Sequence, residues 1–376
     1  MRSEWRQCSL ADLADLSGGF AFKSKDYSES GRFVLRTLNI RDDGSISHEN
    51  AVYLPEELCE QYLRFELQPD DTLFVMVGAT RGKVGLVRES DLPALLNQNM
   101  WLIRAKPDVA DRRFIHYAFR YAAKRSLRWA SGSARDFVRR DDYRSMQIGA
   151  PPFYEQQAIA CILGTLDDKI ELNRRMNQTL EAMAQAIFKS WFVDFDPVRA
   201  KAAGEQPPGL APHIADMFPC AFEESELDEI PKGWRVKPLD RIANYQNGLA
   251  LQRYPPEGDE FLPVIKIREL RQGSSDERSG KASPDIREDC IIEDGDIIFS
   301  WSGSLLVDIW CGGRGALNQH LFKVTSTRYP RWFYYHWTRH HLAEFQRIAA
   351  GKATTMGHIK RHHLSDALVA VPPDEV

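Results

Sequence analysis

The sequence lacks cysteine pairs, long apolar runs and any signal-peptide core, and each absence excludes a class of protein. Its six cysteines, at positions 8, 59, 161, 220, 290 and 311, form no CxxC pair, which argues against a zinc or redox motif. Scattered cysteines in a chain of 376 residues are typical of reduced cytosolic thiols. The N-terminus has no apolar core, and no run of about 18 apolar residues predicts a membrane span. We expect a cytoplasmic protein without a membrane segment.

Overall positive charge is also absent. The net charge is −4, so any surface for nucleic acid must be local rather than general. Hydrophobic residues make up 43% of the chain and aromatic residues 11%, which is enough for packed cores and argues against disorder. The length predicts two or three domains.

Catalytic signatures are missing as well. Residues 78–84, GATRGKV, resemble a phosphate-binding loop, but the spacing is one residue short and no Ser or Thr follows the lysine. Residues 150–153, APPF, resemble an adenine-methyltransferase loop, but Ala150 cannot accept the hydrogen bond that the first residue of that loop receives. No glycine-rich cofactor loop follows a predicted strand. We therefore expect no catalytic centre and no bound cofactor in this chain.

What the sequence does contain is a repeat. Seven segments recur in the same order at an offset that falls from 229 to about 219 residues. Trp5-Arg6 returns as Trp234-Arg235, and later pairs follow the same order. These pairs are residues 19–22 with 248–251, 67–74 with 292–299, 97–99 with 318–320, 113–115 with 331–333, 132 with 351, and 148–152 with 369–373. Such a long period indicates two copies of one domain.

Each copy mixes strand and helix signals. The runs 72–77 and 296–301 are rich in β-branched and aromatic residues and are bounded by Gly or Asp, which is typical of strands. The stretches 111–129 and 330–350 have helical periodicity. The predicted fold class is α+β, with two similar domains joined by a long coiled-coil helix.

The segment between the copies predicts that helix. From Glu155 to Pro197 only Gly164 interrupts the helical sequence, and a heptad seam continues for more than four heptads. Forty helical residues span ~60 Å, and an isolated helix this long needs a partner to bury its seam. An ordinary core helix is the alternative interpretation. The seam residues are Ile159, Leu163, Leu166, Ile170, Asn173, Asn177, Leu180, Ala184, Ile187 and Trp191.

An acidic stretch follows the predicted helix. Residues 205–231 contain seven acidic residues and no Lys or Arg, so we expect a solvated, partly unstructured linker. The predicted organisation is a first domain at 1–152, a spacer helix at 153–198, a linker at 199–231, a second domain at 232–373 and the start of another helix at 374–376.

The junction between the first copy and the helix carries a family resemblance. Residues 150–159 read APPFYEQQAI and residues 163–173 read LGTLDDKIELN, with Asn177, Leu180 and Glu181 beyond and AIFKSWFVDFDP near the helix end. With the duplicated domain, this set resembles the specificity (S) subunits of type I restriction–modification systems over nearly the whole chain.

The resemblance implies a non-catalytic subunit in which each target-recognition domain reads one half of a bipartite site in double-stranded DNA. Half-sites about one DNA turn, ~34 Å, apart suit two readers on a long spacer. The helix would dock methyltransferase (M) subunits, and translocase–nuclease (R) subunits would join through these. S-adenosylmethionine, ATP and magnesium would belong to the partners. Relatives have a second antiparallel helix where this sequence ends at Val376, so we expect a truncated form that self-associates through residues 155–194 or requires M subunits.

Two matched basic stretches are candidates for holding phosphates. Residues 111–144 and 328–363 each carry a net charge of +6 with histidine neutral, although solvated helix faces are the alternative. Amides, hydroxyls and arginines in nearby loops are candidates for reading bases or for capping the loops themselves. The DNA-binding candidates are Thr80, Arg81, Lys83, Asn97, Gln98, Asn99, Ser133, Arg135, Arg139, Arg140, Ser302, Ser304, Asn318, Gln319, His320, Lys352, Thr354, Lys360 and Arg361.

Two histidine clusters, at 336–341 and 358–363, have the i,i+4 spacing of metal ligands. Their counterparts in the first copy are not histidines, so we expect surface or DNA-facing side chains and no metal.

Two other functions remain to be separated from DNA reading. A self-contained methyltransferase or nuclease would need the missing signatures, and an adaptor that binds only proteins would leave the matched basic stretches unexplained.

Overall fold

The computed structural model describes residues 5–78, 80–130, 140–351 and 357–374. The chain divides into two compact units, Met1–Met176 and Asn177–Val376, and each is described by itself. The division falls within α5 (Phe153–Phe188), the long helix that the sequence predicts. The two parts of this helix therefore belong to different units.

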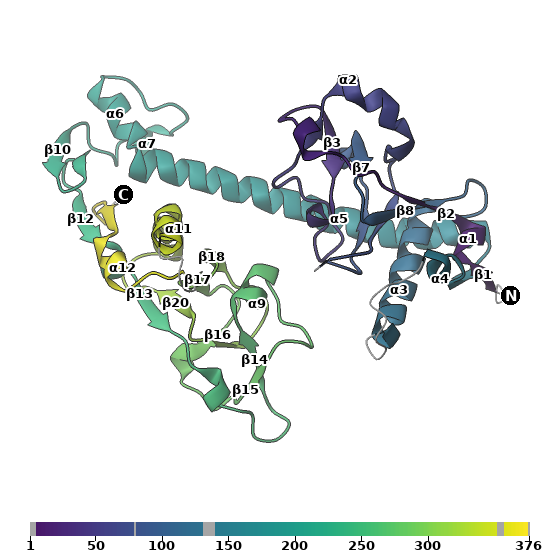
Figure 1. Cartoon of the computed structure of the whole chain (residues 1–376). Helices are drawn as coiled ribbons and strands as arrows, with labels where there is room; N and C mark the ends of the chain where they lie inside the picture. The colour runs from purple at the N-terminus through teal and green to yellow at the C-terminus, as the bar shows by residue number, and fades with distance from the viewer. Residues whose placement is uncertain (1–4, 79, 131–139, 352–356, 375–376) are drawn as a thin grey trace. The chain divides into compact units, whose positions relative to one another are not determined.

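The first unit contains three small sheets and the helices that pack on them (Figure 1). Its strands are β1 (Arg6–Ser9), β2 (Ala14–Gly18), β3 (Arg32–Leu35), β4 (Tyr53–Leu54), β5 (Thr72–Val75), β6 (Val84–Leu86), β7 (Ala94–Leu96), β8 (Met100–Ala105) and β9 (Gln147–Ala150). Its helices are α1 (Leu10–Leu13), α2 (Glu56–Cys59), α3 (Arg112–Ala130), α4 (Arg140–Arg144) and the first part of α5.

The second unit begins with the end of α5 and repeats this arrangement. Its helices are α6 (Asp196–Ala202), α7 (Pro212–Ala215), α8 (Leu239–Ile242), α9 (Ile267–Gln272), α10 (Arg331–His340), α11 (Leu342–Ala350) and α12 (His362–Asp366). Its strands are β10 (Phe222–Ser225), β11 (Asp228–Pro231), β12 (Arg235–Pro238), β13 (Asn244–Asn247), β14 (Leu262–Ile265), β15 (Lys281–Ala282), β16 (Ile291–Ile292), β17 (Ile297–Ser300), β18 (Leu306–Ile309), β19 (Gly315–Leu317), β20 (Leu321–Thr325) and β21 (Leu368–Val371).

Strand pairing confirms the internal repeat. The antiparallel pair β1–β9 corresponds to β12–β21, and the sheet β2-β8-β5-β6 corresponds to β13-β20-β17-β18. The third sheet of each unit contains one parallel pair, β3 with β7 and β14 with β19. Register agrees too, because Arg6 pairs with Ala150 and Arg235 pairs with Val371. The predicted α+β class and the two similar domains are confirmed.

Each unit has its own apolar core. In the first unit, α3 packs on the central sheet through Phe114, Ile115 and Phe119, which lie against Phe74 of β5. Strand β5 is buried on both faces, which explains its uninterrupted apolar sequence. In the second unit, the equivalent core joins the central sheet to α10 and α11.

A repeated glycine brings two chain segments unusually close in each domain. A Cβ atom at Gly19 would lie 2.0 Å from the Asn97 carbonyl oxygen, and one at Gly248 would lie 2.3 Å from that of Asn318. Both distances are far below contact, so only glycine fits. The close approach allows an isolated backbone β-bridge between Phe20 and Asn97 in the first domain. The equivalent β-bridge in the second domain joins Leu249 to Asn318.

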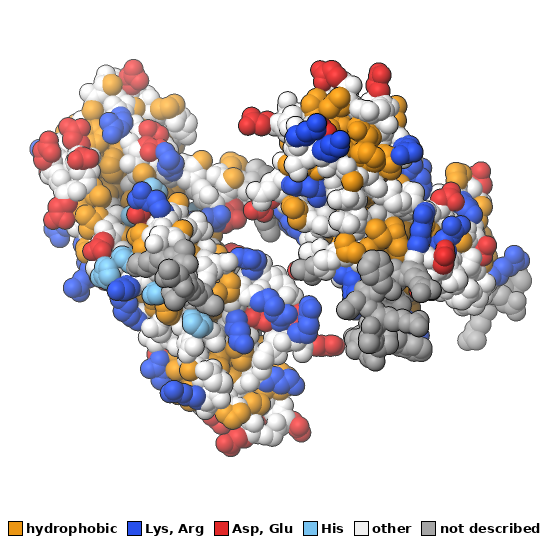
Figure 2. Space-filling model, viewed as in Figure 1, with side chains coloured by type: hydrophobic (Ala, Val, Ile, Leu, Met, Phe, Trp, Pro, Cys, Tyr) orange, Lys and Arg blue, Asp and Glu red, His pale blue; other side chains and the backbone are white. Residues whose placement is uncertain are grey.

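The acidic stretch is structured, and the prediction of a partly unstructured linker was wrong. It contains α7 and the β10–β11 hairpin, and α6 lies just before it. Its apolar residues Phe218 and Ile230 are buried in the core of the second unit, together with Val198 of α6. Lys201 donates to the backbone carbonyl groups of Ala215 and Phe218. Figure 2 shows the acidic side chains, in red, on the surface of this segment. Acidic residues can remain in water while apolar residues among them pack.

The continuous α-helix also ends earlier than the predicted spacer. It reaches Phe188, continues as one π-helical turn (Lys189–Val193), and is broken at Phe195, whose φ of 57° is left-handed. Phe192 and Phe195 turn into the core there. Trp191, which we assigned to the seam, packs on Phe218.

Candidate nucleic-acid interface

In the second domain, three loops that we predicted as DNA-binding converge at one place. The Ser302 and His358 backbones form a β-bridge, and the Gly303 amide donates to the Gly357 carbonyl oxygen at 2.8 Å. Ser302 Oγ lies 2.9 Å from Nδ1 of His320. The loop after β17, the β19–β20 turn and the segment before α12 therefore form one surface. Figure 2 shows basic and histidine side chains gathered on the visible face of this domain.

Within this surface, some candidates support the loops and others reach solvent. Ser302 and Asn318 are buried, and Asn318 Oδ1 accepts from the His320 amide. Gln319 and His320 are half-buried, and Ser304 is exposed. The two buried side chains therefore support the loops, whereas the other three are at least partly exposed to solvent. Lys352 and Thr354 lie outside the described residues.

Trp301 and His358 belong to the same surface; sequence reasoning placed His358 among the surface or DNA-facing histidines but missed Trp301. The Trp301 ring lies between the rings of His320, at a centroid distance of 5.9 Å, and His358, at 6.4 Å. The sequence signal that could have identified Trp301 is its position, because this aromatic residue directly follows β17 and begins the candidate loop.

The first domain brings the corresponding loops together. The Met76 amide donates to the Asn99 carbonyl oxygen, which joins the loop after β5 to the β7–β8 turn. Asn97 is buried and its amide donates to the Tyr27 hydroxyl group. Gln98 and Asn99 are exposed at the tip of the turn. Asn99 has a φ of 71°, a conformation that asparagine tolerates well.

The basic candidates of this loop differ in how they are held. The Lys83 ammonium group forms an ion pair of 2.9 Å with Asp42 and donates to the Ile40 carbonyl oxygen. Arg81 is exposed and Thr80 is half-buried. Lys83 therefore fixes a neighbouring loop. Ser133, Arg135 and Arg139 lie outside the described residues.

The matched basic stretches serve two purposes. Arg113 forms ion pairs with Asp70 at 2.8 Å and with Asp168 at 2.7 Å, so it stabilises the fold. Arg361 donates to the Tyr245 carbonyl oxygen and lies over the Phe322 ring, although part of it is exposed. Arg140 and Lys360 are exposed side chains suited to phosphate.

His336 of α10 is buried and His341, directly after α10, is half-buried, which corrects their assignment to a surface, whereas His340 is exposed as expected. His336 stacks on Phe188 at 5.1 Å and His341 stacks on Trp337 at 6.0 Å. Burial lowers the pKa of His336, and it lowers the pKa of His341 to about 4, so both are neutral at physiological pH. Among the described residues, no group of three or more His, Cys, Asp or Glu side chains could hold a metal ion.

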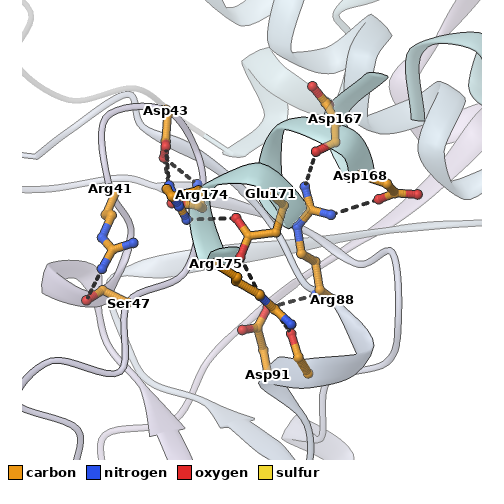
Figure 3. A network of polar contacts seen from close by, with 12 residues as sticks. Arg41, Asp43, Ser47, Arg88, Asp91, Asp167, Asp168, Glu171, Arg174 and Arg175 are labelled. Carbon is orange, nitrogen blue, oxygen red and sulfur yellow. Dashed lines mark hydrogen bonds and ion pairs between the residues drawn. The ribbon is translucent and has the colours of Figure 1, made fainter. Parts of the chain in front are cut away.

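The first part of α5 docks on the first domain through a network of charges, shown in Figure 3. Asp168 receives hydrogen bonds from Arg88 at 2.8 Å and from Arg113 at 2.7 Å. Burial alone would raise the pKa of Asp168, but the two arginines outweigh it and lower that pKa. Farther along, Arg174 bonds Asp43 and Glu171. Asp168 therefore stays charged, and these ion pairs fix this face of α5 to the domain.

The last part of α5 docks on the second domain mainly through aromatic side chains. Phe188 and Phe192 are buried against Trp332, Phe333 and Trp337. One polar contact accompanies them, because Glu181 accepts from the Tyr335 hydroxyl group at 2.8 Å and pairs with Arg339. Tyr117 makes the matching contact in the first domain, donating to Asp167 at 2.8 Å.

Most of the predicted seam remains exposed within these units. Leu166 is 57% exposed, Ile170 65% and Leu180 56%. Leu163, Asn173, Asn177, Ala184 and Ile187 are exposed as well, whereas Ile159 and Trp191 are half-buried. Each part of the helix therefore packs on its own domain and leaves an apolar stripe that the described residues do not cover.

Comparison with known proteins agrees with this architecture. Residues 2–182 match the family model described as type I restriction modification DNA specificity domain. These residues take in the first domain and most of α5, so this part of the chain is similar to that family. The second domain repeats the first in strand order and register.

Individual members show the range of similarity. The HindI specificity subunit of Haemophilus influenzae is 36% identical over 170 residues, which cover 35% of this chain and 37% of that subunit. The MjaIX specificity subunit of Methanocaldococcus jannaschii is 27% identical over 79% of this chain and 67% of that subunit. The S subunit from M. genitalium shares the fold, with a TM-score of 0.50 and 14% identity over 99% of this chain and 85% of that one.

Proposed function

We propose that this chain is the DNA-recognition subunit of a type I restriction–modification complex. Each domain reads one half of a bipartite site in double-stranded DNA, and α5 docks the methyltransferase subunits. The observation that carries the proposal is the repeated convergence of polar loops, at Gln98 and Asn99 in one domain and at Gln319 and His320 in the other. Amide and imidazole groups at a loop tip can bond base edges in the major groove.

The two domains read different sequences. The loop after β5 contains Arg81 and Lys83, whereas the loop after β17 contains Ser302 and Ser304 at the corresponding place. Arginine and serine offer different donor and acceptor patterns to a base pair. The half-sites therefore differ, and the full site is asymmetric.

Catalysis belongs to the partner subunits in this proposal. Methyltransferase subunits supply the S-adenosylmethionine site, and translocase–nuclease subunits, which join through them, use ATP and magnesium. The exposed stripe of α5 is the contact surface for methyltransferase helices.

No helix among the described residues is long and apolar enough to cross a membrane. We place the working complex in the cytoplasm, where the DNA is.

Methylation mapping tests the proposal. The chain is co-expressed with the methyltransferase subunit of its native host, and modified adenines are located by sequencing genomic DNA. We expect one bipartite motif that disappears when the methyltransferase is expressed alone. Replacing residues 1–150 with the domain of a relative should change one half of the motif. Methylation by the purified chain alone, or a change in both halves, would contradict the proposal.

A further inference from the structure

The β19–β20 turn of the second domain holds its backbone in one place. The Asn318 amide, at the start of the turn, donates to the Ile265 carbonyl oxygen at 3.1 Å. The His320 carbonyl oxygen, near the end of the turn, accepts from the Trp301 amide at 3.4 Å. The backbone that carries Gln319 and His320 is therefore bonded to neighbouring segments on both sides.

Three side chains at this turn form a hydrogen-bonded network, which we call the turn network. Ser302 Oγ lies 2.9 Å from Nδ1 of His320, and Nε2 of the same ring lies 3.3 Å from Nε2 of Gln319. An amide nitrogen only donates hydrogen bonds, so Nε2 of His320 accepts from Gln319. An accepting Nε2 leaves the proton of the ring on Nδ1, which donates to the Ser302 hydroxyl oxygen. The direction of both bonds follows from this chemistry.

The inner part of the turn network is held firmly. Ser302 is 4% exposed, and its backbone forms a β-bridge with His358. The His320 ring also lies 5.9 Å from the Trp301 ring. Turning the imidazole over would break its bonds to Ser302 and to Gln319 together. The acceptor that faces Gln319 is therefore fixed.

The Gln319 amide keeps an acceptor and a donor for a ligand. A glutamine amide has two N–H donors and one carbonyl acceptor, and His320 takes one of the donors. Among the described residues, no donor is bonded to Gln319 Oε1, and the side chain is only half-buried. The remaining acceptor and donor match the edge of adenine in the major groove, where N6 donates and N7 accepts.

Guanine is a poorer match for an amide held in this way. Its major-groove edge has two acceptors, O6 and N7, so it would require both donors of the Gln319 amide. A free glutamine could turn its amide over to offer them. Here that rotation would bring Oε1 of Gln319 against Nε2 of His320, which is also an acceptor. The bond between the two side chains would be lost.

We propose that Gln319 selects adenine in the half-site that the second domain reads, and that His320 and Ser302 are positioning residues that fix the orientation of its amide. This inference rests on the proposed DNA-recognition function and adds the base and the residue that chooses it. Gln319 acts on the DNA directly, whereas the two positioning residues act through it.

The first domain has the same glutamine without the turn network. Gln98 occupies the place of Gln319, and Asn99 occupies the place of His320. The second residue after β5 is Val77, where the second residue after β17 is Ser302. Valine has no hydroxyl group to orient the residue at position 99. The fixed amide is therefore a property of the second domain, and the first half-site serves as an internal control.

DNA with modified bases tests the proposal on the complex of this chain with its methyltransferase subunits. Methylation sequencing locates the site, and each adenine of the second half-site, apart from the methylated one, is replaced in turn. The replacements are 7-deazaadenine, which lacks the N7 acceptor, and purine, which lacks the N6 amino group. By fluorescence anisotropy, we expect one adenine at which each replacement weakens binding at least about tenfold. In the Gln319→Ala complex, the same replacements should change binding by less than about twofold.

Variants of the positioning residues separate orientation from affinity. His320→Phe keeps a ring beside Trp301 but removes both nitrogens, and Ser302→Ala removes the hydroxyl group. Each should lower the preference for adenine over guanine at that position about fivefold, with unchanged binding to unrelated DNA. Gln272→Ala, an exposed glutamine at the end of α9, is the matched control and should keep the preference.

The outcomes distinguish this inference from the function on which it rests. A complex that binds no specific site would contradict the proposed function itself. Specific binding without an adenine that depends on Gln319 would overturn only the present inference. An unchanged adenine preference in both His320→Phe and Ser302→Ala, or a change of base preference in the first half-site, would overturn it as well.

Discussion

The Gly164→Ala substitution provides the sharpest test of how α5 is fixed to the first domain. Gly164 is buried in the middle of α5, where alanine would ordinarily stabilise a helix by about 1 kcal/mol. An added Cβ atom would lie 2.6 Å from Nη1 of Arg113 and 3.2 Å from its Cδ atom. Alanine therefore requires the Arg113 side chain to move.

The movement breaks ion pairs that the structure shows to be short. Arg113 bonds Asp70 at 2.8 Å and Asp168 at 2.7 Å, and the three side chains are between 28% and 47% exposed. Partial exposure reduces each contact to about 1 kcal/mol through solvent screening. Losing both contacts outweighs the helix gain, so Gly164→Ala should destabilise the docked helix by about 1 kcal/mol.

Removing Arg113 should reverse the sign. In an Arg113→Ala background there is no guanidinium group to displace, so Gly164→Ala should stabilise α5 by about 1 kcal/mol. The coupling between the two substitutions is then about 2 kcal/mol. Hydrogen exchange of the amides in residues 156–176 measures the opening free energy in all four proteins. Equal effects of Gly164→Ala in both backgrounds would refute the reasoning.

Four further outcomes follow from the described contacts. Burial and nearby arginines lower the pKa of His116 from 6.5 to about 3, so below pH 6.5 the unfolded chain binds a proton that the folded chain does not. The unfolding free energy of the first domain should fall with decreasing pH by up to about 1.4 kcal/mol per pH unit more in the wild type than in His116→Gln; equal slopes in urea titrations would contradict this. Phe188→Ala should destabilise the second domain by about 3–5 kcal/mol and Phe188→Leu by less than about 1.5 kcal/mol, measured by denaturant unfolding; similar losses would argue against a packed ring. Leu166→Lys with Ile170→Lys should abolish self-association in light scattering and co-purification of methyltransferase subunits, with unchanged hydrogen exchange in both domains; persistence of both associations would show that the stripe is not a contact surface. Lys360→Ala should weaken binding to all DNA sequences equally and reduce the salt slope by about one, and a loss confined to one base pair would instead indicate base reading.

Sequence periodicity and repetition determined much of the fold. Seven ordered matches predicted two α+β domains because equivalent strands need the same apolar faces, and the paired sheets agree. The heptad pattern predicted a long helix, which extends from Phe153 to Phe188. Polar residues in the loops after strands were the signal for the candidate surface, and two of them, Ser302 and His320, are in contact in the structure.

Tertiary structure alone decided which polar groups are available. From the sequence alone, three basic side chains were equally available to bind phosphate. In the structure each has a partner from a distant part of the chain: Lys83 pairs with Asp42, Arg113 pairs with Asp168, and Arg361 donates to the Tyr245 carbonyl group. Burial likewise keeps His336 and His341 neutral, because it lowers the pKa of both, and apolar packing orders the acidic stretch. Local sequence fixes periodicity and charge, whereas pairing and desolvation depend on residues that only folding brings together.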